Sequence, residues 1–191
     1  MINVLIVGVG GQGTLLASRV LGAIASIEGK DCKLSEVHGM SQRGGSVVTH
    51  VRIGDDIAAP LVTPGEADYI MAFEQLEALR WAYYLKEGGK ILVNDQQIMP
   101  MPVITGAVEY PEGIYVKLAE AGKEAIVVDG LGLAEEAGNT KAVNVVMIGA
   151  LCAIEGVDYD VALEAVRRSV PAKLLSVNEK ALELGYKSVK K

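Results

Sequence analysis

The chain has 191 residues, a length that suits one domain with a full hydrophobic core. Half of the residues are hydrophobic, but no apolar run reaches the roughly 18 residues that a membrane-spanning helix needs. The chain carries 18 basic and 24 acidic residues, and the net charge of −6 disfavours nucleic acid as a partner. No basic segment precedes the apolar start, so we expect no signal peptide and a soluble, cytoplasmic protein.

Cysteine and histidine are too scarce to predict a metal centre in this chain. Cys32 and Cys152 lie far apart and form no CxxC pair, and His38 and His50 are the two histidines of the sequence. This set offers too few ligands for a structural zinc ion or an iron–sulfur cluster. We expect both cysteines to be reduced thiols.

Strands and helices alternate along the first two thirds of the chain. Apolar and β-branched runs predict strands at residues 1–7, 32–37, 46–53, 68–73, 90–93 and 125–128. Helical spacing of apolar residues predicts helices at 14–27, 75–85, 114–121, 141–154, 159–169 and 172–184. In this prediction Gly88 and Gly89 stop the second helix, and Gly185 ends the last one.

This alternation predicts a single domain, 1–191, with a three-layer α/β/α architecture. A mainly parallel, Rossmann-like sheet would occupy residues 1–130, and a helical C-terminal part, 131–191, would pack on it. The helix at 141–154 is apolar nearly all round, so we expect it to be buried.

A glycine-rich stretch, VGVGGQGT, joins the first predicted strand to the first helix. Its spacing satisfies the G-x-G-x-x-G pattern, in which glycines let a ligand approach the backbone closely. The N–H groups at the start of the following helix can then bind an anion. We therefore expect a phosphate-bearing ligand to be held by Gly8, Gly10, Gly11, Gln12, Gly13 and Thr14.

Three alternatives remain open for this glycine loop. A dinucleotide such as NAD or FAD would need an acidic residue at the end of the second strand, and Glu36 lies near the required position. The additional Gly11 and the polar loop after Glu36 depart from a plain dinucleotide fingerprint. Another phosphate-bearing ligand is the second alternative, and a tight turn without any ligand is the third.

A second polar loop, HGMSQRGGS, follows the second predicted strand and should lie beside the glycine loop. Arg43 could clamp a phosphate or carboxylate, Ser41 offers a hydrogen bond, and Gly44 and Gly45 permit close approach. The alternative is a surface turn that needs its glycines only for positive φ. His38 has no cysteine or carboxylate partner that the sequence identifies. Arg43 and His38 are weak catalytic candidates, and we leave the catalytic residue unassigned.

Other polar residues are better explained by structure. His50 lies inside a predicted strand, and Asn139 and Asp158 are positioned to cap helices. Asp129 ends a strand and could cap the next helix or line the same rim. Asn144 lies inside an apolar helix and therefore needs a polar partner.

Three segments together resemble one known family: VGVGGQGTLLASRVLG, EVHGMSQRGGSVVTHVRIG and NTKAVNVVMIGAL. They are similar to the γ-type domain of 2-oxoacid:ferredoxin oxidoreductases, and the resemblance covers nearly the whole chain. The HGMSQRGG form resembles the branch that acts on indolepyruvate.

The resemblance implies an oxidative decarboxylation in which an aryl-2-oxoacid, coenzyme A and oxidised ferredoxin give an acyl-CoA, carbon dioxide and reduced ferredoxin. It implies that thiamine diphosphate and 4Fe-4S clusters lie on a larger partner subunit, because this sequence has neither the thiamine motif nor cluster cysteines. The chain should then be inactive alone, with coenzyme A as the ligand of its glycine loop. A stand-alone NAD(P)-binding dehydrogenase or sensor domain and a purely structural subunit are the alternatives.

Overall fold

The computed structural model describes residues 1–38 and 45–190; of His38 it describes only the backbone. Within these residues, six strands form one sheet in the order β2-β3-β1-β4-β5-β6. The strands are β1 (Ile2–Val9), β2 (Asp31–His38), β3 (Ser46–Gly54), β4 (Ala67–Ala72), β5 (Leu85–Asn94) and β6 (Glu124–Val128).

One strand runs against all the others. The pairs β1–β4, β4–β5 and β5–β6 are parallel, whereas β3 is antiparallel to both β1 and β2. The connection from β2 to β3 is too short for the crossover of a dozen or more residues that a parallel pair requires. The other five strands share one direction, so the prediction of a mainly parallel sheet is confirmed.

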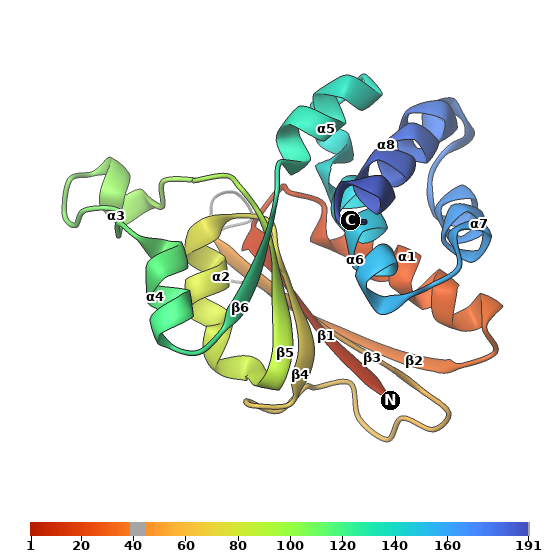
Figure 1. The fold of residues 1–191 in the computed structure, drawn as a ribbon, viewed down its shortest axis with the longest axis horizontal. Helices are drawn as coiled ribbons and strands as arrows, with labels where there is room; N and C mark the ends of the chain where they lie inside the picture. Colours follow the sequence, from red (N-terminus) through yellow and green to blue (C-terminus); the bar gives the residue numbers. More distant parts are fainter. Residues whose placement is uncertain (39–44, 191) are drawn as a thin grey trace.

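Helices cover both faces of the twisted sheet (Figure 1). On one face lie α2 (Gln75–Trp81) and α4 (Ile114–Glu120), and the short α3 (Met101–Ile104) extends outward from them. On the other face lie α1 (Thr14–Ile27) and α6 (Val143–Glu155). The remaining helices on that side are α5 (Gly130–Ala137), α7 (Tyr159–Ser169) and α8 (Leu175–Ser188). Short 3₁₀ helices are η1 (Ala82–Tyr84), η2 (Thr140–Ala142) and η3 (Ala172–Leu174).

Two hydrophobic cores hold these layers together. Ile6 of β1 contributes to the core beneath α1 and α6, and Leu5 contributes to the core beneath α2 and α4. Successive residues of a strand point to opposite faces, so a strand covered on both sides is apolar throughout. The predicted burial of α6 is confirmed, because its residues from Asn144 to Cys152 are all buried.

Two glycine predictions are wrong for reasons of packing. Gly88 and Gly89 do not stop a helix but lie in β5, where the register with β4 shifts. A Cβ on Gly89 would lie 2.9 Å from the Asp68 carbonyl oxygen, so this close approach requires glycine. Gly185 lies inside α8, which continues to Ser188, and a Cβ there would meet the Val146 backbone carbon at 2.7 Å.

No helix in the described part of the chain is both long enough and apolar enough to cross a membrane.

Candidate functional site

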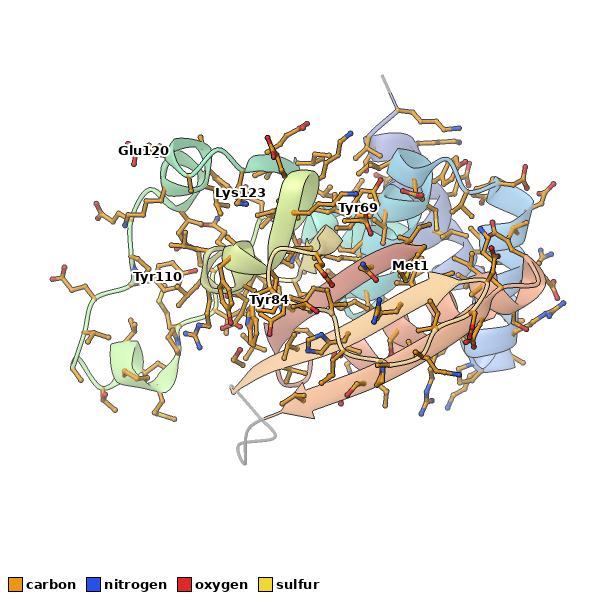
Figure 2. All side chains as sticks on the ribbon, turned by 90° about the horizontal axis from the view of Figure 1, so that it is seen from below. Met1, Tyr69, Tyr84, Tyr110, Glu120 and Lys123 are labelled. Atoms are coloured by element: carbon orange, nitrogen blue, oxygen red, sulfur yellow. The ribbon has the colours of Figure 1, made fainter. Side chains whose placement is uncertain are left out.

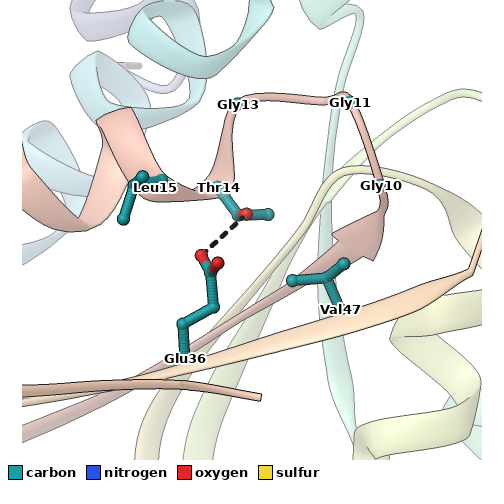
Figure 3. Close-up of a pocket in the computed structure, with 7 residues that line it drawn as sticks. All are labelled: Gly10, Gly11, Gly13, Thr14, Leu15, Glu36 and Val47. Atoms are coloured by element: carbon teal, nitrogen blue, oxygen red, sulfur yellow. Dashed lines mark hydrogen bonds between the residues drawn. The ribbon is translucent and has the colours of Figure 1, made fainter. Parts of the chain in front are cut away.

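The glycine loop turns sharply from β1 into α1 at the carboxyl end of the sheet (Figure 3). Gly11 and Gly13 have φ angles of +103° and +83°, a region that L-residues with side chains rarely adopt. In the described part of the chain, the N–H groups of Thr14 and Leu15 at the start of α1 have no hydrogen-bond acceptor. These donors and the helix dipole favour an anion at this end of α1.

Gly8 and Gln12 hold the strand end in place. Gly8 lies inside β1, not in the loop, and a Cβ there would lie 2.8 Å from Gln12 Oε1. The Val9 N–H donates to Gln12 Oε1 at 2.7 Å, and Gln12 Nε2 donates to the Phe73 carbonyl at 3.0 Å. The Gln12 amide therefore connects β1 to the end of β4 by hydrogen bonds, which fixes the base of the loop.

Asn144 braces the other end of the loop from α6. Its Nδ2 donates to the Gly13 carbonyl at 3.3 Å, and its Oδ1 accepts from the Val145 N–H at 2.9 Å. A Cβ on Gly13 would collide with this amide, whose Cγ lies 3.2 Å from the Cβ position. The buried Asn144 thus has the polar partner that the sequence demanded, and that partner is the glycine loop.

A first cavity of about 300 Å³ opens on the β2 side of the glycine loop. Gly10, Gly11, Gly13, Thr14, Leu15, Glu36 and Val47 line it. The Glu36 carboxylate faces the start of α1, where it accepts from Thr14 Oγ1 at 3.4 Å (Figure 3). It also accepts from Thr49 Oγ1 of β3 at 3.3 Å. This acidic group can accept hydrogen bonds from a ligand hydroxyl, but it repels a phosphate.

A second cavity of about 590 Å³ opens on the α6 side of the same loop. Its lining comprises Gly11, Gln12, Gly13, Leu16, Gln96, Ile98, Leu131, Thr140, Lys141, Val143 and Asn144. Sequence reasoning missed Lys141, Thr140 and Gln96 as site residues. The NTKAVN segment was visible as a motif, but nothing local to it indicates that it lies against the glycine loop.

A third cavity of about 450 Å³ lies between α2 and the segment around α3. It is lined by apolar residues of that segment together with Glu74, Glu77, Arg80 and Glu109. Burial raises the pKa of Glu74, which accepts from the Tyr110 hydroxyl at 3.1 Å. Tyr110 lies on the segment between α3 and α4 (Figure 2).

Glu77 beside it is also nearly inaccessible and is held by three partners. Trp81 Nε1 donates to its Oε2 at 3.0 Å, the Ser46 hydroxyl donates to the same oxygen, and Arg80 Nε lies 3.4 Å from Oε1. Sequence reasoning missed both buried carboxylates, Glu74 as the N-cap of α2 and Glu77 within that helix, because glutamate is ordinarily exposed.

The two loops at this rim touch where the structure describes them both. The Gly10 N–H donates to the Gly45 carbonyl at 2.9 Å, which places the end of the second loop beside the glycine loop. Ser41, Arg43 and Gly44 lie outside the described residues, as does the His38 side chain.

His50 is buried inside β3, and its Nδ1 accepts from the Val62 N–H at 3.1 Å. Burial lowers its pKa, so the neutral ring serves as a structural acceptor. Cys32 and Cys152 are both free thiols, and within residues 1–38 and 45–190 no three potential ligands cluster to hold a metal.

Comparison with known proteins identifies relatives over almost the entire chain. The family described as pyruvate ferredoxin/flavodoxin oxidoreductase matches residues 3–188. The chain is 44% identical to the indolepyruvate oxidoreductase subunit IorB of Pyrococcus horikoshii, over 98% of this chain and 96% of that protein.

Solved structures share the fold. The gamma subunit of a keto/oxoacid ferredoxin oxidoreductase from Geobacter sulfurreducens superposes with a TM-score of 0.73 at 27% identity, covering 98% of both chains. The 2-oxoglutarate:ferredoxin oxidoreductase of Magnetococcus marinus, solved with 2-oxoglutarate, coenzyme A and succinyl-CoA, superposes with the same TM-score of 0.73. That match covers 97% of this chain and 30% of the other at 18% identity, so it supports the fold alone. The resemblance inferred from the three sequence segments is confirmed: the chain belongs to the pyruvate ferredoxin/flavodoxin oxidoreductase family, as a subunit of a 2-oxoacid:ferredoxin oxidoreductase.

Proposed function

We propose that this chain is the small subunit of an indolepyruvate:ferredoxin oxidoreductase. The observation that carries the proposal is the 44% identity to the Pyrococcus horikoshii subunit over nearly the full length of both chains. The overall reaction converts an aryl-2-oxoacid, coenzyme A and oxidised ferredoxin into an aryl-acyl-CoA, carbon dioxide and reduced ferredoxin. Two electrons leave the oxoacid carbon and reduce ferredoxin, and the CoA sulfur takes the acyl group while its thiol proton is released.

The decarboxylation chemistry belongs to a partner subunit in this proposal. Thiamine diphosphate and 4Fe-4S clusters would lie on that larger chain and supply the carbanion chemistry and the electron path. Co-expression with the larger subunit should therefore give a complex that oxidises indolepyruvate. If the purified small chain alone oxidises indolepyruvate with added thiamine diphosphate and an acceptor, the assignment is wrong.

Within the complex, we assign coenzyme A binding to this chain. The donors at the start of α1 and the cavities on both sides of Gly11 and Gly13 support a phosphate-bearing ligand. No side chain in the described part of the chain lies within 4 Å of a Cβ placed on Gly11, so a small residue there would project into the space that a ligand needs.

Gly11→Ala tests this assignment, and Gly29→Ala is its matched control. Gly11 and Gly29 flank α1, have φ angles of +103° and +72°, and have open space at their Cβ positions among the described residues. Both substitutions therefore place a Cβ on a residue with a positive φ and open space around it, but Gly11 alone of the pair lines the cavities. Gly11→Ala should raise the KM for coenzyme A and leave the KM for the oxoacid unchanged. Equal coenzyme A dependence in both variants would overturn the assignment.

A NAD(P)-binding domain is the second candidate, and one observation favours it. Glu36 lies against Thr14 at the start of α1, the place where a dinucleotide-binding fold holds its ribose. Titration of the complex with NADH, followed by fluorescence, distinguishes the two. Saturable NADH binding that Glu36→Gln abolishes, without coenzyme A binding, would favour the dinucleotide.

A further inference from the structure

The three cavities around the rim of the sheet differ in the sign of their charged lining. In the part of the chain that the structure describes, Glu36 is the charged residue of the first cavity. The third cavity holds Glu74, Glu77 and Glu109 against Arg80. Lys141 is the charged residue of the second cavity. Among the described residues, the carboxylates disfavour a phosphoryl group in the first and third cavities, and the Lys141 ammonium favours it in the second.

Lys141 is placed by the same segment that braces the glycine loop. Its backbone N–H donates to Asn139 Oδ1 at 3.0 Å, which begins the turn η2. Three residues later, Asn144 donates to the Gly13 carbonyl. The chain between these two anchors is short, so the lysine is held at the edge of the cavity that Gly11 and Gly13 also line.

The remaining lining of the second cavity suits a nucleotide-like ligand. Thr140 and Gln96 contribute polar groups, and Leu16, Ile98, Leu131 and Val143 contribute apolar surface. A volume of about 590 Å³ lies within the usual range for small-molecule sites.

We propose that a phosphoryl group of coenzyme A occupies this second cavity, on the opposite side of the glycine loop from Glu36, with Lys141 as its cationic partner. The proposal rests on the coenzyme A binding assigned above and adds the side of the loop and the residue that recognises the anion. Glu36 then lies away from the phosphoryl group.

Lys141→Met tests the charge in the assembled complex, because methionine keeps much of the length and removes the ammonium. The KM for coenzyme A should rise about tenfold, the lower part of the range for a hydrogen bond between charged groups, since Lys141 is exposed. Lys141→Arg should restore most of the affinity. Raising the salt concentration should weaken coenzyme A binding less in Lys141→Met than in the parent. Lys117→Met is the control, because Lys117 is an exposed lysine of α4 on the other face of the sheet.

Dephospho-coenzyme A distinguishes the two phosphoryl sources, because it keeps the diphosphate and lacks the 3′-phosphate. If the penalty of Lys141→Met persists with dephospho-coenzyme A, Lys141 pairs with the diphosphate. If the penalty disappears, it pairs with the 3′-phosphate. Both outcomes support the second cavity.

Two results would overturn the proposal. The first is an unchanged KM for coenzyme A in Lys141→Met while Gly11→Ala still raises it, which would leave the proposed function intact. The second is a Glu36→Gln variant that binds coenzyme A about tenfold more tightly, which would place the phosphoryl group in the first cavity. If neither Lys141→Met nor Gly11→Ala changes the coenzyme A dependence, the assignment of coenzyme A to this chain fails as well.

Discussion

Gly13 and Asn144 form a contact whose energy can be measured by a double-mutant cycle. Gly13→Ala introduces two costs: a side chain at a φ of +83° and a collision with the Asn144 amide. The left-handed conformation costs about 1–2 kcal/mol for a residue with a Cβ. Overpacking against a buried side chain costs about 1–3 kcal/mol. Gly13→Ala should therefore lower the free energy of unfolding by about 2–5 kcal/mol.

Combined with Gly13→Ala, Asn144→Ala should remove the collision and leave only the backbone strain at residue 13. The single substitution loses the hydrogen bonds of the amide, about 1 kcal/mol. In the double mutant, the Cβ of residue 144 lies 3.6 Å from the new Cβ at residue 13, an ordinary contact. The double mutant should therefore be less destabilised than the sum of the two single substitutions, by the overpacking cost of about 1–3 kcal/mol.

Urea denaturation of the four proteins, followed by circular dichroism, measures these differences. Gly11→Ala is the control, because Gly11 has a φ of +103° and no described atom within 4 Å of its Cβ position. Its cost should be the strain alone and should add to that of Asn144→Ala. If the Gly13 and Asn144 costs add within about 0.5 kcal/mol, the bracing of the glycine loop by α6 is refuted.

Three further predictions address other parts of the chain. Gly185→Ala should destabilise the protein by about 1–3 kcal/mol in urea denaturation, because the Val146 backbone cannot yield to a Cβ, whereas Gly156→Ala should show only the strain of its φ of +79°. Burial raises the pKa of the Glu74 carboxyl above its ordinary 4.5, so the folded state binds the carboxyl proton more tightly than the unfolded state. The free energy of unfolding should therefore fall as the pH rises from 4.5 through the raised pKa of the folded state. The stability of Glu74→Gln relative to the parent should therefore increase between pH 4 and pH 7. A stability difference in urea denaturation that is the same at both pH values would contradict a raised pKa of Glu74. The sequence alone predicts that Arg43→Ala lowers turnover of the intact complex roughly 10–150-fold, through loss of a charge-assisted hydrogen bond. Unchanged kinetics would indicate that the second loop serves only as a surface turn.

Local signals in the sequence were sufficient for most of the elements. The apolar spacing of residues 14–27 predicted α1 with the bounds that the structure shows. Asp158 caps α7 as expected, with Oδ1 accepting from the Asp160 N–H at 2.8 Å. Asp129 caps α5 in the same way, and Asn139 caps η2. Each of these features depends on residues a few positions apart, so the local sequence pattern is enough to predict it.

Long-range contacts were beyond the local pattern. Asn144 and Gly13 are 131 positions apart, and no periodicity indicates that the start of α6 lies against the glycine loop. For the same reason, the sequence pattern did not predict that Lys141 lines a cavity beside the glycine loop. Gly185 shows a different limit, because a glycine that permits close helix packing and one that ends a helix look alike in a sequence.

The glycines of the loop also differ in what they do, although the motif treats them as equivalent. Gly8 is required by its approach to Gln12 and Phe73, and the Gly10 N–H bonds the Gly45 carbonyl. Gly13 is required by its φ and by Asn144, whereas Gly11 has the unusual φ but open space around it among the described residues. Gly11 therefore leaves room that a ligand can use. The motif therefore fixes the turn. In our proposal the charges of Glu36 and Lys141, contributed by other elements, decide on which side of the loop a phosphoryl group binds.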